Sequence, residues 1–295
     1  MTHDGVNGHP APTGRVAAVV PAAGSGVRLG AGIPKAFVEL GGETMLERCV
    51  AGLLASGVVD DVVAVVPEDR VQEAERLLAP LRVGDHVVVV TVGGAERTDS
   101  VRNGLAALTT ARAGAPGAGT DRPAVPGAAV ATTGYDVLLV HDAARCLTPA
   151  EPIRRVVAAV RSGEVAVVPV VPVVDTVKQV DADAYVVGTP DRATLRAVQT
   201  PQGFDPDTLL AAYDAAGDAA TDDAGLVERL GRRVATVDGA ALAFKVTTAE
   251  DRMRAEFQLL SERSLAEGPQ TMTFGWQLYR PETDSEPPRA PQEDQ

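Results

Sequence analysis

The stretch VVPAAGSGVRLGAGIPKAF, from Val19 to Phe37, decides the fold class of this chain. It follows a short apolar run and contains four glycines, one arginine and a Pro-Lys pair. A buried strand followed by a glycine-rich loop is typical of α/β proteins that bind phosphates, because glycine lets backbone N–H groups approach the anion closely. The stretch therefore predicts a phosphate site at the end of the first strand.

The segments around this loop alternate between two kinds of regular structure. Short valine-rich runs predict strands buried on both faces, and apolar residues at helical spacing predict helices. Thr44 and Glu47 have the spacing of a capping box at the start of one helix. The expected strands are Val16–Val20, Val62–Val66, Val87–Val92, Val137–Val140, Val165–Val171 and Val234–Val237, and the expected helices are Thr44–Ser56, Val71–Leu81, Thr98–Leu108, Pro149–Arg161, Pro206–Ala216, Thr221–Leu230 and Thr248–Arg263. This order predicts an α/β fold with a Rossmann-like, mostly parallel sheet and helices on both faces.

Two well-known phosphate-binding loops do not match the opening stretch. A P-loop requires a GK[ST] triplet, but none follows Gly30, and Pro34 stands directly before Lys35, where the helix of a P-loop would run. A dinucleotide fingerprint requires G-x-G-x-x-G, and the spacing from Gly24 through Gly26 to Gly30 is one residue too long. An ATPase of the P-loop type and a dehydrogenase are therefore both disfavoured.

The remaining interpretation is a loop that binds a triphosphate. Its backbone N–H groups, with Arg28 and Lys35, offer donors and two positive charges that suit a charge spread over several oxygens. During in-line attack on a triphosphate, negative charge grows on the departing pyrophosphate, and cations placed there lower the barrier. The alternative is that Arg28 and Lys35 are surface charges on a tight turn.

The composition limits the classes of function. The chain has 295 residues, 45% of them hydrophobic, and a formal net charge of −13. This negative charge disfavours nucleic-acid partners, although a local cluster of Arg and Lys still suits a small anionic substrate. The two cysteines form no CxxC or Cys/His cluster, which argues against a zinc site. No stretch has the pattern of a transmembrane helix or a signal peptide, so we expect a cytoplasmic protein with no membrane partner.

Four segments differ in composition or pattern from the alternating core. Residues 1–13 are small and polar, and residues 268–295 are rich in Pro, Glu and Asp, so both predict disordered tails. An Ala/Gly/Pro-rich insert at about 110–134 predicts a flexible surface loop. Residues of about 172–200 carry two short β-like pieces and predict an extension that leaves the main sheet. The predicted organisation is one domain, 14–267, between two tails.

Seven short motifs follow one another along the chain in an order that is specific. They are PAAGSGVRLGAGIPKAF, GGAERTDSV, HDAAR, DTVK, QTPQGF, TDDA and FKVTTAED. Together, over roughly Arg15 to Leu265, they resemble the 2-C-methyl-D-erythritol 4-phosphate cytidylyltransferases of the non-mevalonate isoprenoid pathway. The resemblance implies transfer of CMP from CTP to that polyol phosphate, with release of pyrophosphate and with Mg²⁺ or another divalent cation as cofactor.

The resemblance also implies a CTP site. Arg28 and Lys35 would stabilise the transition state, and Asp142 would lie by the ribose and the magnesium region as a metal contact. The implied CTP-binding residues are Ala22, Ala23, Gly24, Gly26, Gly93, Gly94, Ser100, Asp142 and Ala143. The alternative for Asp142 is a capping or turn residue, and His141 is expected to serve packing or hydrogen bonding instead of acting as a base.

The acceptor is a phosphate monoester whose oxygen is already a nucleophile, so the site must mainly bring two anions together. The resemblance implies catalytic roles for Lys245, in the acceptor pocket, and for Arg192. The implied acceptor-binding residues are Arg145, Thr176, Thr200, Thr221 and Asp222. Thr176 and Arg192 would belong to a β-rich dimerisation arm, about 172–200, that completes the site of the neighbouring subunit in a homodimer. The alternative for Arg192 is an exposed charge on the arm.

Three positions depart from the family pattern. Ala95 stands where an acidic residue is common, Cys146 where proline is usual, and Ala243 where asparagine is usual. Two other functions therefore stay open: transfer to another polyol phosphate such as ribitol 5-phosphate, and nucleotide binding without catalysis. The retained cations argue against the second, because their value lies in the transition state.

Overall fold

The computed structural model describes residues 14–24, 32–113, 134–216 and 222–266. Its central layer is an eight-stranded sheet with the strand order β10-β7-β11-β6-β1-β4-β5, in which β12 also pairs with β7. The strands are β1 (Arg15–Pro21), β4 (Asp61–Val66), β5 (Val87–Val92), β6 (Tyr135–Val140), β7 (Ala166–Pro172), β10 (Arg196–Val198), β11 (Gln202–Phe204) and β12 (Ala235–Asp238). Each of the six predicted strands is present with ends shifted by two residues at most.

Most neighbouring strands of this sheet run parallel, as predicted. Strand β1 is central and pairs in parallel with β4 and β6, β4 pairs in parallel with β5, and β12 pairs in parallel with β7. The exceptions are β10 and β11, which the sequence pattern did not predict. Strand β11 lies antiparallel between β6 and β7, and β10 is antiparallel to β7.

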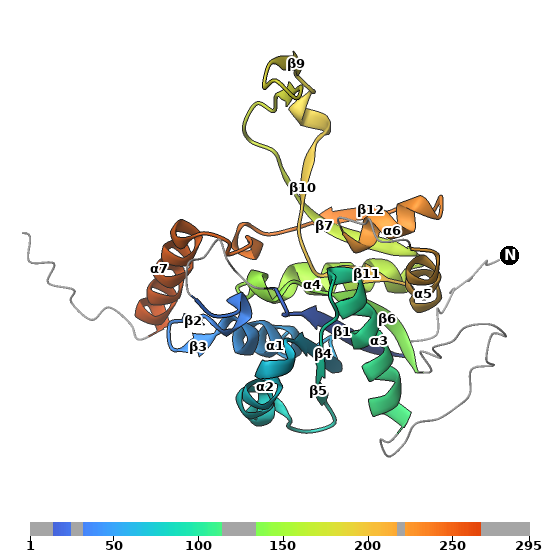
Figure 1. Ribbon diagram of the computed structural model, residues 1–295, viewed down its shortest axis with the longest axis vertical. Coiled ribbons are helices and arrows are strands. Elements are labelled where there is room, and N and C mark those ends of the chain that lie inside the picture. Colours follow the sequence, from blue (N-terminus) through green and yellow to red (C-terminus); the bar gives the residue numbers. More distant parts are fainter. Residues whose placement is uncertain (1–13, 25–31, 114–133, 217–221, 267–295) are drawn as a thin grey trace, which may run out of the picture.

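Helices cover both faces of the sheet (Figure 1). The alternation of side chains along β1 explains why, because Val16, Ala18 and Val20 enter one core, whereas Ala17 and Val19 enter the other. The first core is completed by α1 (Met45–Ala55), α2 (Val71–Leu78), α4 (Ala150–Arg161) and α7 (Ala249–Ala266), and the second by α3 (Arg97–Ala113), α5 (Pro206–Ala215) and α6 (Asp223–Arg229). The predicted Rossmann-like α/β fold is confirmed.

Helix α1 begins where its sequence predicts. The Thr44 hydroxyl accepts a hydrogen bond from the Glu47 backbone N–H at 3.1 Å, and the Glu47 carboxylate accepts one from the Thr44 N–H at 2.8 Å. The capping box is therefore complete. Before it, β2 (Glu39–Leu40) and β3 (Glu43–Thr44) form a short hairpin that the periodicity did not reveal.

Two predicted boundaries are wrong. Helix α3 continues to Ala113, so residues 110–113 belong to a helix and not to the predicted insert; the rest of that insert, 114–133, lies outside the described residues. The predicted helix Val71–Leu81 ends at Leu78, and a 3-10 turn, η4 (Ala79–Leu81), follows because Pro80 has no N–H to continue the α-helical ladder. Both predicted tails, 1–13 and 268–295, lie outside the described residues.

The predicted extension is shorter than expected, because its two ends pair within the main sheet. Pro172 and Arg196 are register partners of β7 and β10. The segment between these strands extends away from the layered body (Figure 1) and carries the antiparallel pair β8 (Gln179–Val180) and β9 (Val186–Gly188). We call residues 173–195 the arm. Within the described part of the chain, no helix is both long and apolar enough to span a membrane.

Two helical glycines provide a matched test of the packing. A Cβ atom at Gly104 in α3 would lie 2.5 Å from Val19 Cγ1 and 2.9 Å from Val65 Cγ2, whereas one at Gly52 in α1 would meet no described atom of the surroundings within 4 Å. We expect Gly104→Ala to lower the free energy of unfolding by about 1–3 kcal/mol through overpacking. Gly52→Ala should raise it by about 0.5–1 kcal/mol. Urea unfolding measures both, and equal effects would contradict the close packing of α3 on β1 and β4.

Candidate active site

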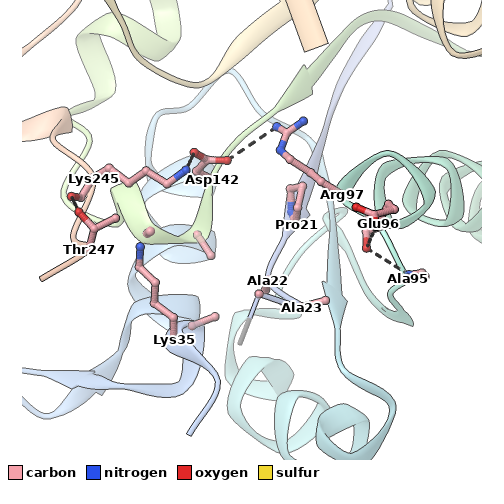
Figure 2. A pocket seen from close by; sticks show the side chains of 16 residues that line it. Pro21, Ala22, Ala23, Lys35, Ala95, Glu96, Arg97, Asp142, Lys245 and Thr247 are labelled. Carbon is pink, nitrogen blue, oxygen red and sulfur yellow. Dashed lines mark hydrogen bonds and ion pairs between the residues drawn. The ribbon is translucent and has the colours of Figure 1, made fainter. Parts of the chain in front are cut away.

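A cleft of about 420 Å³ opens at the carboxyl ends of β1 and β6, next to the loop after β5. This is where ligands bind in α/β sheets, and its volume lies in the range of small-molecule sites. The residues around it come from five separate segments of the chain, which are far apart in sequence (Figure 2). They are Pro21, Ala22, Ala23, Gly24, Lys35, Ala36, Gly94, Ala95, Glu96, Arg97, Ser100, Asp142, Ala143, Ala144, Lys245 and Thr247.

The described part of the opening loop lines the cleft, as predicted for Ala22, Ala23 and Gly24. The Ala22 N–H donates to the Val65 carbonyl at 2.7 Å, which ties the start of the loop to β4. Gly26 and Arg28 lie outside the described residues. Their predicted roles stay predictions.

Lys35 reaches the cleft from the far side of the loop. It opens the 3-10 helix η2 (Lys35–Phe37), and the next two residues, Ala36 and Phe37, are buried and fix this turn on the core. The Lys35 side chain rises from this turn into the cleft in Figure 2. Because two residues of this turn are buried, the turn can hold the Lys35 ammonium group in a fixed position.

The segment after β5 packs against the opening loop at Gly93 and against the start of α3 at Gly94, in both cases too closely for a side chain. A Cβ atom at Gly93 would lie 2.7 Å from Ala23 Cβ, and one at Gly94 would lie 2.2 Å from Asp99 Cβ. The Gly94 N–H donates to Ser100 Oγ at 3.1 Å, and this hydroxyl donates in turn to the Glu96 carbonyl at 3.1 Å. Gly94 and Ser100 line the cleft as predicted, while Gly93 supports it from behind.

Asp142 is the acidic centre of the cleft. Its side chain is only 14% exposed; Lys245 Nζ lies 2.7 Å from Oδ2 and Arg97 Nη2 lies 3.7 Å from Oδ1. Burial opposes ionisation, but Lys245, Arg97 and Arg145 together hold the pKa of Asp142 below its ordinary value. Asp142 stands at the N-cap position of η5 (Ala143–Arg145), but its side chain makes no capping hydrogen bond. The carboxylate therefore faces the cations of the cleft instead of capping the turn.

His141 and Thr200 lie directly behind Asp142. Thr200 Oγ1 is 2.8 Å from His141 Nδ1 and accepts a hydrogen bond from the Asp142 N–H at 3.0 Å. Both side chains are buried, and burial lowers the pKa of His141 to about 4, so the ring is neutral at pH 7. Thr200, predicted as an acceptor contact, is here a support for the Asp142 backbone and does not line the cleft.

Arg145, also predicted as an acceptor contact, makes its hydrogen bonds to backbone carbonyls. Its guanidinium donates to the Ala243 carbonyl at 2.7 Å and to the Val198 carbonyl at 3.2 Å, and it does not line the cleft. Nε is buried without a hydrogen bond and lies 4.0 Å from Asp142 Oδ2. Arg145 thus ties the loop before Lys245 to β10. One of these carbonyls belongs to Ala243, which departs from the family pattern. Because the contact is to the backbone, it does not depend on the side chain at this position.

Of the other predicted acceptor residues, those that the structure describes do not line the cleft. Thr221 lies outside the described residues, and Asp222 caps α6 by accepting from the Gly225 N–H at 3.0 Å. Thr176 and Arg192 are exposed on the arm, and Arg192 Nη1 donates to the Val174 carbonyl at 2.6 Å. Neither residue lines the cleft, and the arm that carries them extends away from the layered body (Figure 1).

Sequence reasoning missed Arg97. This residue begins α3 inside the quoted motif GGAERTDSV and lines the cleft, where its Nη1 and Nη2 donate to the two carboxylate oxygens of Asp223 at 2.8 and 2.6 Å. Asp223 is fully buried. The signal available in the sequence was an arginine placed between the Gly-Gly pair and Ser100, but its partner lies 126 positions away.

The other two departures from the family pattern have different surroundings. Ala95 lines the cleft, so the acidic residue common there would have faced the ligand. Cys146 is buried in the same core as Cys49, and burial raises its pKa to about 12, which leaves its thiol protonated. No group of three or more His, Cys, Asp or Glu side chains that could hold a metal ion occurs among the described residues.

Comparison with known proteins gives one consistent result. The family model for 2-C-methyl-D-erythritol 4-phosphate cytidylyltransferase matches residues 16–114 and 117–261. Proteins of that name from Nocardia farcinica and Rhodococcus jostii are 56% and 53% identical to this chain. The alignments cover 85% and 82% of this chain and 96% and 94% of those proteins.

Solved structures agree. The 4-diphosphocytidyl-2C-methyl-D-erythritol synthase of Anaerococcus prevotii superposes with a TM-score of 0.66 at 27% identity, over 84% of this chain and 99% of that one. The 2-C-methyl-D-erythritol 4-phosphate cytidylyltransferase of Thermus thermophilus superposes with a TM-score of 0.60 at 33% identity, over 83% and 98%. The ordered motifs, the cleft and these likenesses lead to one conclusion: the chain belongs to the 2-C-methyl-D-erythritol 4-phosphate cytidylyltransferase family.

Proposed function

We propose that this enzyme transfers CMP from CTP to 2-C-methyl-D-erythritol 4-phosphate, giving 4-diphosphocytidyl-2-C-methyl-D-erythritol and pyrophosphate, in isoprenoid precursor synthesis. The observation that carries the proposal is the convergence of Lys35, Arg97 and Lys245 on one cleft at the carboxyl ends of the sheet, in a chain of this family. The chemistry is a nucleotidyl transfer. The cytoplasmic location expected from the sequence stays a prediction.

In the proposed reaction, a phosphate oxygen of the acceptor attacks the α-phosphorus of CTP. A new P–O bond forms, the bond from that phosphorus to the bridging oxygen of the β-phosphate breaks, and its electron pair leaves with pyrophosphate. The attacking oxygen is already anionic, so no side chain has to remove a proton. The cations of the cleft therefore act electrostatically, by lowering the repulsion between two anions and by stabilising the leaving group.

The residues divide between the two substrates. The backbone of Ala22–Gly24, with Lys35, suits the triphosphate, and the glycine segment at Gly94 with Ser100 suits the base. Lys245 lies across the cleft, held by Asp142, where it suits the acceptor phosphate (Figure 2). Arg28 would complete the charge around the leaving group.

The cleft also fits a magnesium ion. Mg²⁺ is usually held by one or two carboxylates plus substrate phosphates, and Asp142 offers one ionised carboxylate in the lining of the cleft. Asp142 would share the ion with the phosphates of CTP. When bound, the ion neutralises phosphate charge and polarises the reacting phosphoryl group.

We further propose a homodimer in which the arm completes the partner's site. The arm exposes Val174, Tyr185, Val186 and Val187, which are between 59% and 77% exposed in the single chain. An exposed apolar surface of this kind favours burial against another surface. The same arm carries Thr176 and Arg192, so its docking would bring a further cation to the acceptor side of the neighbouring cleft.

Pyrophosphate release tests the proposed function directly. We expect release from CTP and Mg²⁺ with 2-C-methyl-D-erythritol 4-phosphate and background release with ribitol 5-phosphate. Release with ribitol 5-phosphate alone would keep the chemistry and change the acceptor. No release with either acceptor, despite CTP binding measured by calorimetry, would favour the non-catalytic alternative and attach importance to Ala95, Cys146 and Ala243.

A further inference from the structure

Arg97 lies between the residues assigned to CTP and those assigned to the acceptor. It begins α3, three residues after Gly94 and three before Ser100, so it is part of the segment assigned to the base of CTP. Its guanidinium is anchored to Asp223, which is the residue after Asp222 on the acceptor side. One side chain thus joins the two segments that would touch the two substrates.

The anchor is rigid because Asp223 is fully buried and doubly paired. Its carboxylate accepts two parallel hydrogen bonds from Arg97 and a third from the Tyr213 hydroxyl. A two-pronged arginine–carboxylate pair fixes the plane of the guanidinium as well as its position. The side chain of Arg97 therefore moves together with the start of α6.

The guanidinium group of Arg97 also approaches the acidic centre of the cleft. Nη2, which donates to Asp223 at 2.6 Å, lies 3.7 Å from Asp142 Oδ1, and Lys245 Nζ lies 2.7 Å from Oδ2 of the same carboxylate. Negative and positive groups alternate in the order Asp223, Arg97, Asp142, Lys245. Figure 2 shows the last three side by side at the top of the cleft. Because these charged groups attract one another, moving one side chain of the row shifts the preferred positions of the side chains next to it.

We propose that Arg97 is a positioning residue that couples the CTP side of the cleft to its acceptor side, so that each substrate raises the affinity for the other. The inference rests on the proposed cytidylyl transfer. Binding of CTP against the segment at Gly94 and Ser100 sets the position of the N-terminus of α3, which carries Arg97. Through Asp223 and Asp142, Arg97 then holds the Asp222 turn and Lys245 in the arrangement that the acceptor phosphate requires.

The coupling is measured by binding, without turnover. The probes are 2-C-methyl-D-erythritol 4-phosphate and a CTP analogue with a methylene group between the α- and β-phosphorus atoms, which blocks transfer. Calorimetry gives the Kd of the acceptor with and without saturating analogue, in Mg²⁺. We expect the analogue to raise acceptor affinity at least tenfold in the wild type, about the usual size of coupling between sites. By linkage, the acceptor must raise analogue affinity by the same factor.

The variant that tests Arg97 is the double substitution Arg97→Gln with Asp223→Asn. It removes both charges together, so no buried carboxylate is left unpaired, while side-chain amides can still form a hydrogen bond. We expect each ligand still to bind alone, with lower affinity because one cation of the cleft is lost, and the coupling factor to fall to about one. Thermal unfolding confirms the fold, and if the double variant does not fold, Arg97→Lys is used, for which the factor must fall severalfold because lysine cannot form the two-pronged pair.

The matched control is Arg102→Gln. Arg102 lies on the same helix and also ties α3 to the α5 region, by donating to the Tyr213 and Ala216 carbonyls, but it does not line the cleft. Its coupling factor should equal that of the wild type. An unchanged factor in the folded Arg97 variants, or independent binding of the two ligands to the wild type, would overturn the inference alone. Failure of the wild type to bind the CTP analogue would overturn the proposed function as well.

Discussion

Replacing Lys35 by alanine is expected to lower kcat about a hundredfold to a thousandfold while the Kd for CTP changes by only a few fold. Lys35 projects from the η2 turn into the cleft, on the side assigned to the triphosphate. Charge on the leaving pyrophosphate is larger in the transition state than in bound CTP, so a cation there contributes mainly to the rate. Steady-state kinetics gives kcat, and calorimetry with the non-transferable analogue gives the binding term.

The control for this variant is Arg76→Ala, which removes an exposed positive charge from α2, away from the cleft. It should leave both quantities at their wild-type values. Arg28→Ala is expected to behave like Lys35→Ala. Equal losses in kcat and in CTP affinity would mean that Lys35 serves binding of the ground state and has no selective role in the transition state.

The second large effect is complementation between subunits. Lys245→Ala and Arg192→Ala should each lower acceptor turnover roughly a hundredfold, since each removes a cation from the acceptor side. In a mixed dimer, one site combines Lys245 of one subunit with Arg192 of the other and is intact. Random reassortment of the two variants should therefore restore up to about a quarter of wild-type activity.

A second mixture provides the control. Lys35 and Lys245 line the cleft of the same chain, so no combination of Lys35→Ala with Lys245→Ala subunits creates an intact site. This mixture should stay inactive. Activity is measured after mild unfolding and refolding of equal amounts of two variants, and dimer content is followed by light scattering. Restoration in neither mixture, although mixed dimers form, would show that Arg192 acts within its own subunit or not at all.

The regular part of the fold could be predicted because local patterns decide it. Val16–Val20 is apolar at every position, as expected for the middle of a sheet covered on both faces, and all five residues are fully buried. Thr44 and Glu47 mark a helix start within four residues of sequence. Strands β10 and β11 could not be found in this way, because three residues such as Gln202–Phe204 carry no period. Their place depends on partners β6 and β7, which are far away in the sequence.

The sequence could indicate those site residues whose partners lie in the same motif. It could not indicate those whose partners are far away in the sequence. Gly94 and Ser100 lie in one motif, and both line the cleft. Arg97 became visible only through Asp223. Thr200 was assigned to the acceptor from its motif, but its hydroxyl is used inside the fold, by His141 and the Asp142 backbone. The motifs indicate which residues belong to the site, whereas burial and hydrogen bonding decide which of these residues face the ligand.

The position of β11 between β6 and β7 has a consequence for synthesis on the ribosome. Strands β1, β4 and β5 form their pairings among residues that are all made by Val92, and β6 joins them at Val140. Strand β7 has no place beside β6 until Gln202–Phe204 has emerged to fill the gap. At ordinary elongation rates, roughly two to six seconds separate the completion of β7 at Pro172 from that of β11 at Phe204. During this interval the edges of β7, an apolar strand, are unpaired. We therefore expect the nascent chain to need protection by a chaperone until β11 is made.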